Sequence, residues 1–83
     1  MLNQNTEDVA REAKRIYQQQ LQAALEESHM NEFVAIEPVS GEYFLGRTLS
    51  EAIGASHLKY PDRLAHALRV GHKAAIHFGL QIG

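Results

Sequence analysis

The sequence predicts a mixed α+β fold, and three observations carry that prediction. An apolar stripe with helical spacing fills the first third of the chain, and two short runs rich in β-forming residues surround a turn near its middle. A capped helical segment then separates these strands from two further alternating runs. We expect a long N-terminal helix followed by β-β-α-β-β, with one antiparallel sheet. Within the 83 residues, the helical element is placed at 1–30 and the ββαββ domain at 31–83.

Residues 6–28 are predicted to form the long helix. Asn5 or Thr6 can cap its first turn, which also carries acidic residues where the helix dipole favours them. Along its outside we expect two ion pairs, Glu7 with Arg11 and Glu12 with Arg15. The apolar stripe recurs at steps of three and four: Val9, Ala13, Ile16, Tyr17, Leu21, Ala24 and Leu25.

This helix is longer than one small sheet is expected to cover. Twenty-three residues give roughly 35 Å of helix, and so small a domain gains little stability from its own core. We therefore expect the helix to act as an arm or as the contact of a homodimer. Four residues of the stripe are the candidate partner interface: Ile16, Tyr17, Leu21 and Leu25.

The first hairpin is predicted from FVAIEP (33–38), VSG (39–41) and EYFLG (42–46). Pro38 ends the first strand, and Gly41 can adopt a positive φ in a three-residue loop. That loop places Ile36 opposite Phe44 and Glu37 opposite Tyr43. The register avoids pairing Glu37 with Glu42, which carry like charges.

The next helix begins with the clearest local signal in the chain. Thr48 and Glu51 form a capping box, and Pro61 should stop the helix near Tyr60. Gly54 in the helix interior costs about 1 kcal/mol relative to alanine, which close packing against the sheet would explain. The expected buried side consists of Leu49, Ala52, Ile53 and Ser56.

Residues 63–70 suit either a helix or a strand. We favour a strand, because Gly71 then falls at a turn before the alternating run AAIHFGLQIG. With 71–73 as the loop, His66 lies on the inner face and His77 points outward. The shared buried side would be Leu64, Leu68, Val70, Ala74, Ile76, Phe78 and Leu80.

The C-terminal third also carries a candidate basic and loop patch: Arg63, Arg69, His72, Lys73 and His77. It could hold an anion through backbone amides and charge. If 71–72 alone formed the turn, His66 would face His77 as half of a zinc or nickel site. We expect no metal and no cofactor, since two histidines without a carboxylate partner are a weak ligand set. A solvated turn accounts for the loop more simply than an anion cradle.

The composition also limits which classes of protein this chain can belong to. There is no cysteine, which excludes disulfides and thiolate ligands. The N-terminus has no signal-peptide pattern and no apolar run approaches membrane-spanning length, so we expect a cytoplasmic protein without membrane contact. Residues 1–46 carry a formal charge of −5 and residues 47–83 of +3, which favours neutralisation within the fold or across a dimer. A pI of about 6.2 argues against binding nucleic acid unaided.

The segment from Phe33 to Val70, carried by FVAIEPVSGEYFLGRTLSEAI, resembles small bacterial domains of unknown function with the order strand, hairpin, strand, helix, strand. The step from Gly46 to the capping box is similar to that of HicB-type antitoxins, which run their strands in a different order. The resemblance implies a two-gene, antitoxin-like module whose neighbouring gene encodes a small protein with a retroviral-type aspartic-protease fold. It implies no catalytic residues.

We therefore expect a non-enzymatic protein-interaction module, antitoxin-like or an accessory subunit of a two-gene system, that forms a homodimer. No cysteine nucleophile or serine elbow motif is present, and a chain of this size scarcely encloses a ligand cavity. The alternative is a small metal- or anion-binding protein that uses the histidine-bearing C-terminal hairpin.

Overall fold

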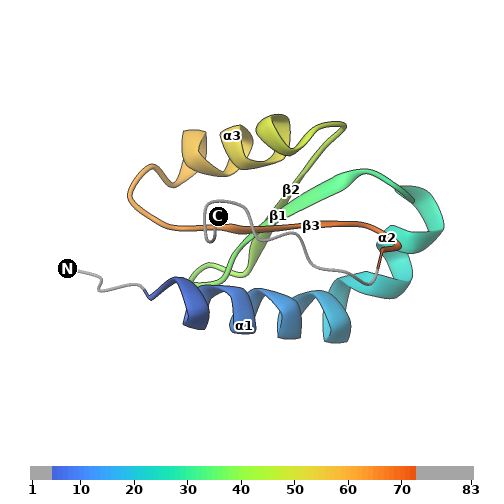
Figure 1. Ribbon diagram of the computed structural model, residues 1–83, viewed down its shortest axis with the longest axis horizontal. Helices are drawn as coiled ribbons and strands as arrows, with labels where there is room; N and C mark the ends of the chain where they lie inside the picture. Colours follow the sequence, from blue (N-terminus) through green and yellow to red (C-terminus); the bar gives the residue numbers. More distant parts are fainter. Residues whose placement is uncertain (1–4, 73–83) are drawn as a thin grey trace, which may run out of the picture.

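A three-stranded antiparallel sheet lies at the centre of the computed structural model, which describes residues 5–72. The strands are β1 (Phe33–Glu37), β2 (Glu42–Gly46) and β3 (His66–Arg69), in the order β2-β1-β3. Helix α1 (Thr6–Ile16) lies on one face and α3 (Leu49–Lys59) on the other (Figure 1). The α+β class is confirmed, and so is the choice of strand within 63–70. The predicted last strand lies outside the described residues.

The N-terminal helical segment is not one straight helix. A π-helical turn, η1 (Tyr17–Leu21), separates α1 from α2 (Gln22–Ser28), and the path bends there (Figure 1). The apolar spacing explains the turn. Apolar residues recur every four positions at Val9, Ala13, Tyr17, Leu21 and Leu25, and on a regular α-helix each such step drifts by about 40° around the axis. The wider turn at η1 absorbs this drift and keeps the later apolar residues facing the sheet.

The expectation that this stripe is too long for the sheet is therefore wrong. Ile16, Tyr17 and Leu25 are buried within the chain, and Leu21 packs against the same core. The segment is part of the domain's core rather than a projecting arm. The core on this face of the sheet consists of Ala13, Ile16, Tyr17, Leu25, Val34, Ile36, Leu68 and Val70.

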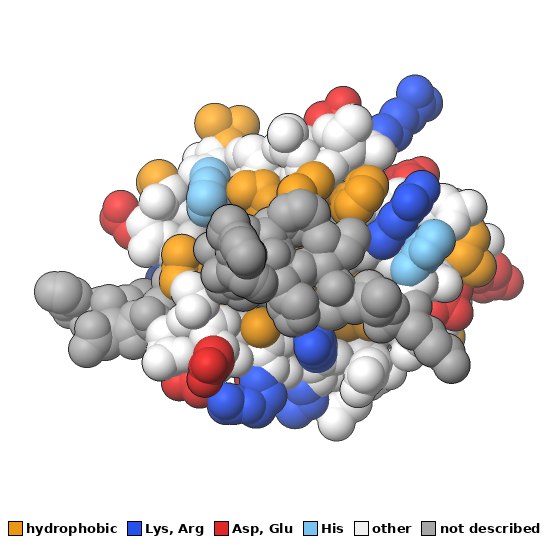
Figure 2. Space-filling model, in the orientation of Figure 1, with side chains coloured by type: hydrophobic (Ala, Val, Ile, Leu, Met, Phe, Trp, Pro, Cys, Tyr) orange, Lys and Arg blue, Asp and Glu red, His pale blue; other side chains and the backbone are white. Residues whose placement is uncertain are grey.

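The N-terminal cap and the ion pairs on the outer face of α1 largely match the prediction from the sequence. The Asn5 side chain caps the helix, accepting hydrogen bonds from the backbone N–H of Glu7 (2.8 Å) and Asp8 (3.3 Å). Arg15 pairs with Glu12 as expected, whereas Arg11 pairs with Asp8 at 2.8 Å rather than with Glu7. In Figure 2 basic side chains gather along the lower edge of the molecule, with acidic side chains beside them.

The register of the first hairpin differs from the prediction by one residue. Glu37 pairs with Glu42 and Ile36 with Tyr43, so the loop holds four residues, 38–41. Gly41 has the expected positive φ, at 80°. The like-charged pair is tolerated because each carboxylate has its own set of partners, described below.

Helix α3 begins as the capping box predicts. The Thr48 hydroxyl accepts the Glu51 N–H at 3.1 Å, and the Glu51 carboxylate accepts the Arg47 N–H at 2.8 Å. The helix ends at Lys59, before Pro61. Ala52 and Ser56 are fully buried against the sheet, while Leu49 and Ile53 are partly buried. Along residues 5–72, no helix combines the length and apolarity needed to cross a bilayer.

Replacing Thr48 with alanine should lower the free energy of unfolding by about 1 kcal/mol, because the Glu51 N–H loses its acceptor. Thermal denaturation followed by circular dichroism measures this as a drop of roughly 4–8 °C in the midpoint. Thr48→Ser, which keeps the hydroxyl, is the matched control and should retain most of the stability. Equal midpoints for Thr48→Ala and the natural chain would contradict the cap.

Gly54 does not have the close-packing role expected of it. It is exposed, and a Cβ added there would meet nothing within 4 Å. The tight approach of α3 to the sheet occurs instead at Gly46, where a Cβ would lie 2.6 Å from the backbone nitrogen of Ala52.

Gly54→Ala should therefore stabilise the protein by about 1 kcal/mol, since alanine is the better helix former and has free space. The urea midpoint should rise with an unchanged slope. A lower midpoint would contradict the placement of Gly54 on the solvent side of α3.

Candidate functional site

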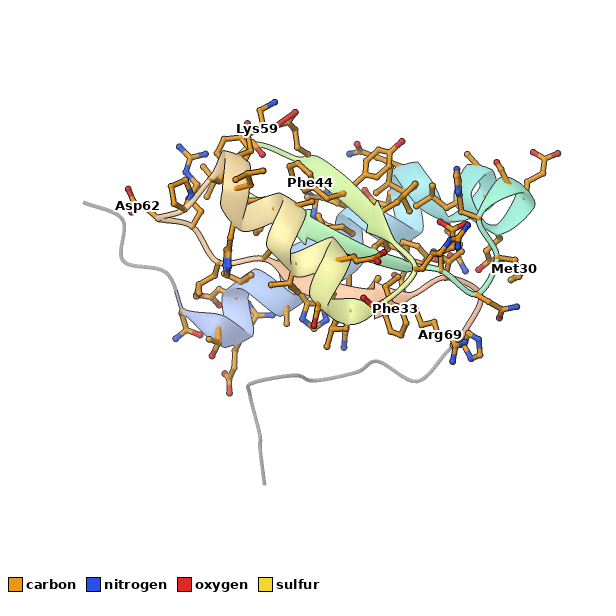
Figure 3. The ribbon with its side chains drawn as sticks, turned by 90° about the horizontal axis from the view of Figure 1, so that it is seen from above. Met30, Phe33, Phe44, Lys59, Asp62 and Arg69 are labelled. Carbon is orange, nitrogen blue, oxygen red and sulfur yellow. The ribbon has the colours of Figure 1, made fainter. Side chains whose placement is uncertain are left out.

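One end of the sheet gathers five charged or aromatic side chains into what we call the hairpin cluster: Glu37, Glu42, Lys59, Tyr60 and Arg63. The two acids come from adjacent ends of β1 and β2, and the other three residues come from the end of α3 and the loop after it. Figure 3 shows Lys59 at this end of the molecule. The cluster joins the β1–β2 hairpin to α3.

Glu37 is the buried member of the hairpin cluster. Its carboxylate accepts the backbone N–H of Val39 and that of Ser40, both at 2.9 Å, and lies 3.4 Å from the Arg63 guanidinium. Burial by itself would raise the pKa of Glu37, but hydrogen bonds from Ser40, Val39 and Arg63 outweigh it, and the pKa lies below its ordinary value. Glu37 thus stabilises the four-residue loop at 38–41 through its bonds to the backbone of that loop.

Glu42 turns toward α3 instead. It accepts hydrogen bonds from the Tyr60 hydroxyl and from Lys59 Nζ, the latter at 2.9 Å. These bonds lower the pKa of Glu42, and the bond to Glu42 raises the pKa of Lys59. The Tyr60 ring meets Phe44 edge-to-face at 6.4 Å and lies 5.1 Å from the Arg63 guanidinium carbon.

The chemistry available to the hairpin cluster follows from these contacts. Both carboxylates are held in the ionised form, and each is bonded to groups of the same domain. A general acid that works near neutral pH needs a raised carboxyl pKa. The shifts here run in the opposite direction, which is typical of a structural ion-pair network.

The opposite end of the sheet is organised by Asn31. Its φ of 73° is left-handed, and its N–H donates to the carbonyl of Val70 at 3.0 Å. The Asn31 carbonyl accepts Arg69 Nε at 3.1 Å, and its side-chain oxygen lies 2.8 Å from His72 Nε2. The Arg69 guanidinium also covers the Phe33 ring at 5.4 Å.

The candidate basic patch is therefore divided. Arg63 lies before β3 and contacts Glu37, while Arg69 and His72 lie after β3 and contact Asn31. Figure 3 places Asp62, the neighbour of Arg63, and Arg69 at opposite ends of the molecule. Lys73 and His77 lie outside the described residues, as does any pairing of His66 with His77.

The histidines that the structure describes are dispersed. His66 is buried on the α1 side of the sheet, opposite Ile36, as the predicted inner-face placement requires. His72 lies beside Asn31, and His29 lies 3.3 Å from Glu32. Among residues 5–72 no three His, Asp or Glu side chains come together as a metal site would require.

The outer edge of β2 is the surface that the sequence interpretation missed. β2 pairs with β1 on one side, and among the described strands none pairs with its other side. Helix α1 contacts β1 and β3, so the half of β2 beside the loop is less covered on that face. There Tyr43 keeps 43% of its surface exposed, and Val39 in the loop keeps 52%.

The register explains why this surface was missed. With Glu37 opposite Tyr43, Tyr43 would have shared a face with Glu37; in the structure it lies opposite Ile36, on the other face of the sheet. A one-residue slip reverses the face of every side chain. The signal that could have revealed the longer loop is the capacity of Glu37 to accept the N–H groups of Val39 and Ser40.

Comparisons with protein-family models, with curated proteins and with solved structures find no match to this chain.

Proposed function

We propose that this chain is a non-enzymatic protein-interaction module, antitoxin-like or an accessory subunit of a two-gene system, and that it binds through the outer edge of β2. The observation that carries the proposal is the coincidence of an unpaired strand edge, within residues 5–72, with the exposed Tyr43 beside it. A strand edge offers backbone hydrogen bonds to an incoming strand, and neighbouring apolar side chains add affinity.

The composition of β2 supports this role. Natural edge strands that must stay unpaired commonly carry lysine, proline or a bulge. The middle of β2 is Tyr-Phe-Leu, and the strand contains none of these features. The hairpin cluster supports the non-enzymatic part of the proposal, because its ionisable groups fix the hairpin to α3.

The experiment captures proteins in the native host with the tagged natural chain and with two tagged variants of it. Mass spectrometry then quantifies two candidates among the captured proteins, an untagged second copy of the chain and the product of the neighbouring gene. Tyr43→Lys places a charge on the binding edge. Leu58→Lys is the matched control, because Leu58 is 86% exposed on α3, outside β2.

We expect one protein to be captured equally by the natural chain and by Leu58→Lys. Its recovery should fall at least tenfold with Tyr43→Lys, which corresponds to about 1.4 kcal/mol of binding free energy. Equal recovery with all three chains would overturn the assignment of the β2 edge as the binding surface.

A further inference from the structure

The side chains of β2 alternate between the two faces of the sheet symmetrically about Phe44, the middle residue of the strand. On the α3 side the strand carries Glu42, Phe44 and Gly46, and on the α1 side Tyr43 and Leu45, with Phe44 at the midpoint. Two copies of such a strand can pair antiparallel about a two-fold axis perpendicular to the sheet, because that axis keeps each side chain on its own face.

Side-chain alternation restricts the registers of such a pair. Directly opposite residues must point to the same face, so only registers that differ by two residues are possible. The register centred on Phe44 pairs all five residues of β2. Registers centred on Tyr43 or Leu45 pair only three residues of β2 with the second strand, and they place Glu42 opposite Phe44 or leave it without a strand neighbour.

The central register is also chemically self-complementary. Tyr43 lies opposite Leu45 of the second copy, and Phe44 lies opposite Phe44 of the second copy, which makes apolar and aromatic pairs. Glu42 lies opposite Gly46 of the second copy, which has no side chain, so its bonds to Lys59 and Tyr60 need not break. No like charges meet.

We infer that the occupant of the β2 edge is a second copy of this chain, joined through β2 in the register centred on Phe44. This inference rests on the proposed function and names its partner. It moves the predicted homodimer contact away from Ile16, Tyr17 and Leu25, which the fold buries, and from Leu21, which packs against the same core. The six described strands of the two copies then form one continuous antiparallel sheet.

Sedimentation equilibrium of the purified full chain tests the inference without any other protein. A short strand contact gives a small interface, so the measurement uses about 100 µM protein, where weak pairs are still populated. The expected mass is close to twice the 9.3-kDa chain. Tyr43→Lys and Tyr43→Glu should both return the mass to the monomer value, while Leu58→Lys should not. Circular dichroism confirms that each variant keeps its helical signal.

The outcomes separate the inference from the proposed function. A monomeric natural chain that still captures another protein through Tyr43 would overturn the second copy as occupant and leave the edge as a binding surface. A dimer unaffected by both Tyr43 variants would overturn the β2 register. A monomer whose capture is also insensitive to Tyr43 would overturn both.

Discussion

Gly46→Ala should cost the fold about 3 kcal/mol, as overpacking against a rigid neighbour does. The new Cβ would lie 2.6 Å from the backbone nitrogen of Ala52 and 2.7 Å from the Cβ of Glu51. Neither atom belongs to the flexible end of a side chain, so α3 would have to move away from β2. The midpoint of thermal unfolding should fall by roughly 12–24 °C, measured by circular dichroism.

Gly54→Ala is the matched control for this variant, because it makes the same chemical change within α3, on open space. The two changes should act in opposite directions. If Gly46→Ala left the midpoint unchanged, α3 could not be packed on β2 as closely as described here.

Glu37→Gln should lower the free energy of unfolding by about 3 kcal/mol at neutral pH. The fully buried carboxylate accepts two backbone N–H groups and faces Arg63, and removing one partner of a buried charged contact is costly. An amide cannot accept both N–H groups with its two terminal atoms, since one of them is itself a donor.

The effect of Glu37→Gln on stability should also depend on pH, in a direction that the pKa of Glu37 predicts. The pKa of Glu37 is lower in the folded chain than its ordinary value of 4.5, so its ionised form stabilises the fold above that pH. This contribution is lost as the pH falls through the folded pKa. The difference in free energy of unfolding between the natural chain and Glu37→Gln, measured by urea denaturation, should therefore become smaller below pH about 4.5. Glu27→Gln, at an exposed position, is the control and should show no such difference. A difference in free energy of unfolding that did not change with pH would contradict an ionised, buried carboxylate at Glu37.

The local features of the fold could be predicted because their causes lie within a few residues. The Thr48 cap, the stop before Pro61 and the positive φ of Gly41 each depend on a residue and its near neighbours. The strand at 66–69 followed from alternation and from the turn at Gly71, whose φ is 86°.

The features that were predicted wrongly depend on contacts distant in sequence or on a cumulative drift. The buried Glu37 at the end of the hairpin contacts Arg63, 26 residues away, and no local sequence pattern indicates that contact. The bend at η1 could have been predicted from the four-residue spacing of Val9, Ala13, Tyr17, Leu21 and Leu25, but only by comparing that spacing with the 3.6-residue helical turn. Without the bend, the helix was predicted to be longer than the sheet could cover. The partner interface was therefore assigned to residues that belong to the core.

The measurement that tests the central claim most directly is disulfide cross-linking, because the natural chain contains no cysteine. In the register centred on Phe44, Phe44→Cys places two thiols directly opposite each other, within the Cα separation that a disulfide spans. Tyr43→Cys alone leaves its two thiols on a diagonal of roughly 7–8 Å, at or beyond that limit. Tyr43→Cys mixed with Leu45→Cys again brings the thiols directly opposite each other.

Under mild oxidation, Phe44→Cys and the mixed pair should give covalent dimers much faster than Tyr43→Cys alone or the exposed control Leu58→Cys. Cross-linking of Phe44→Cys and of the mixed pair no faster than that of Leu58→Cys would contradict a dimer joined through β2.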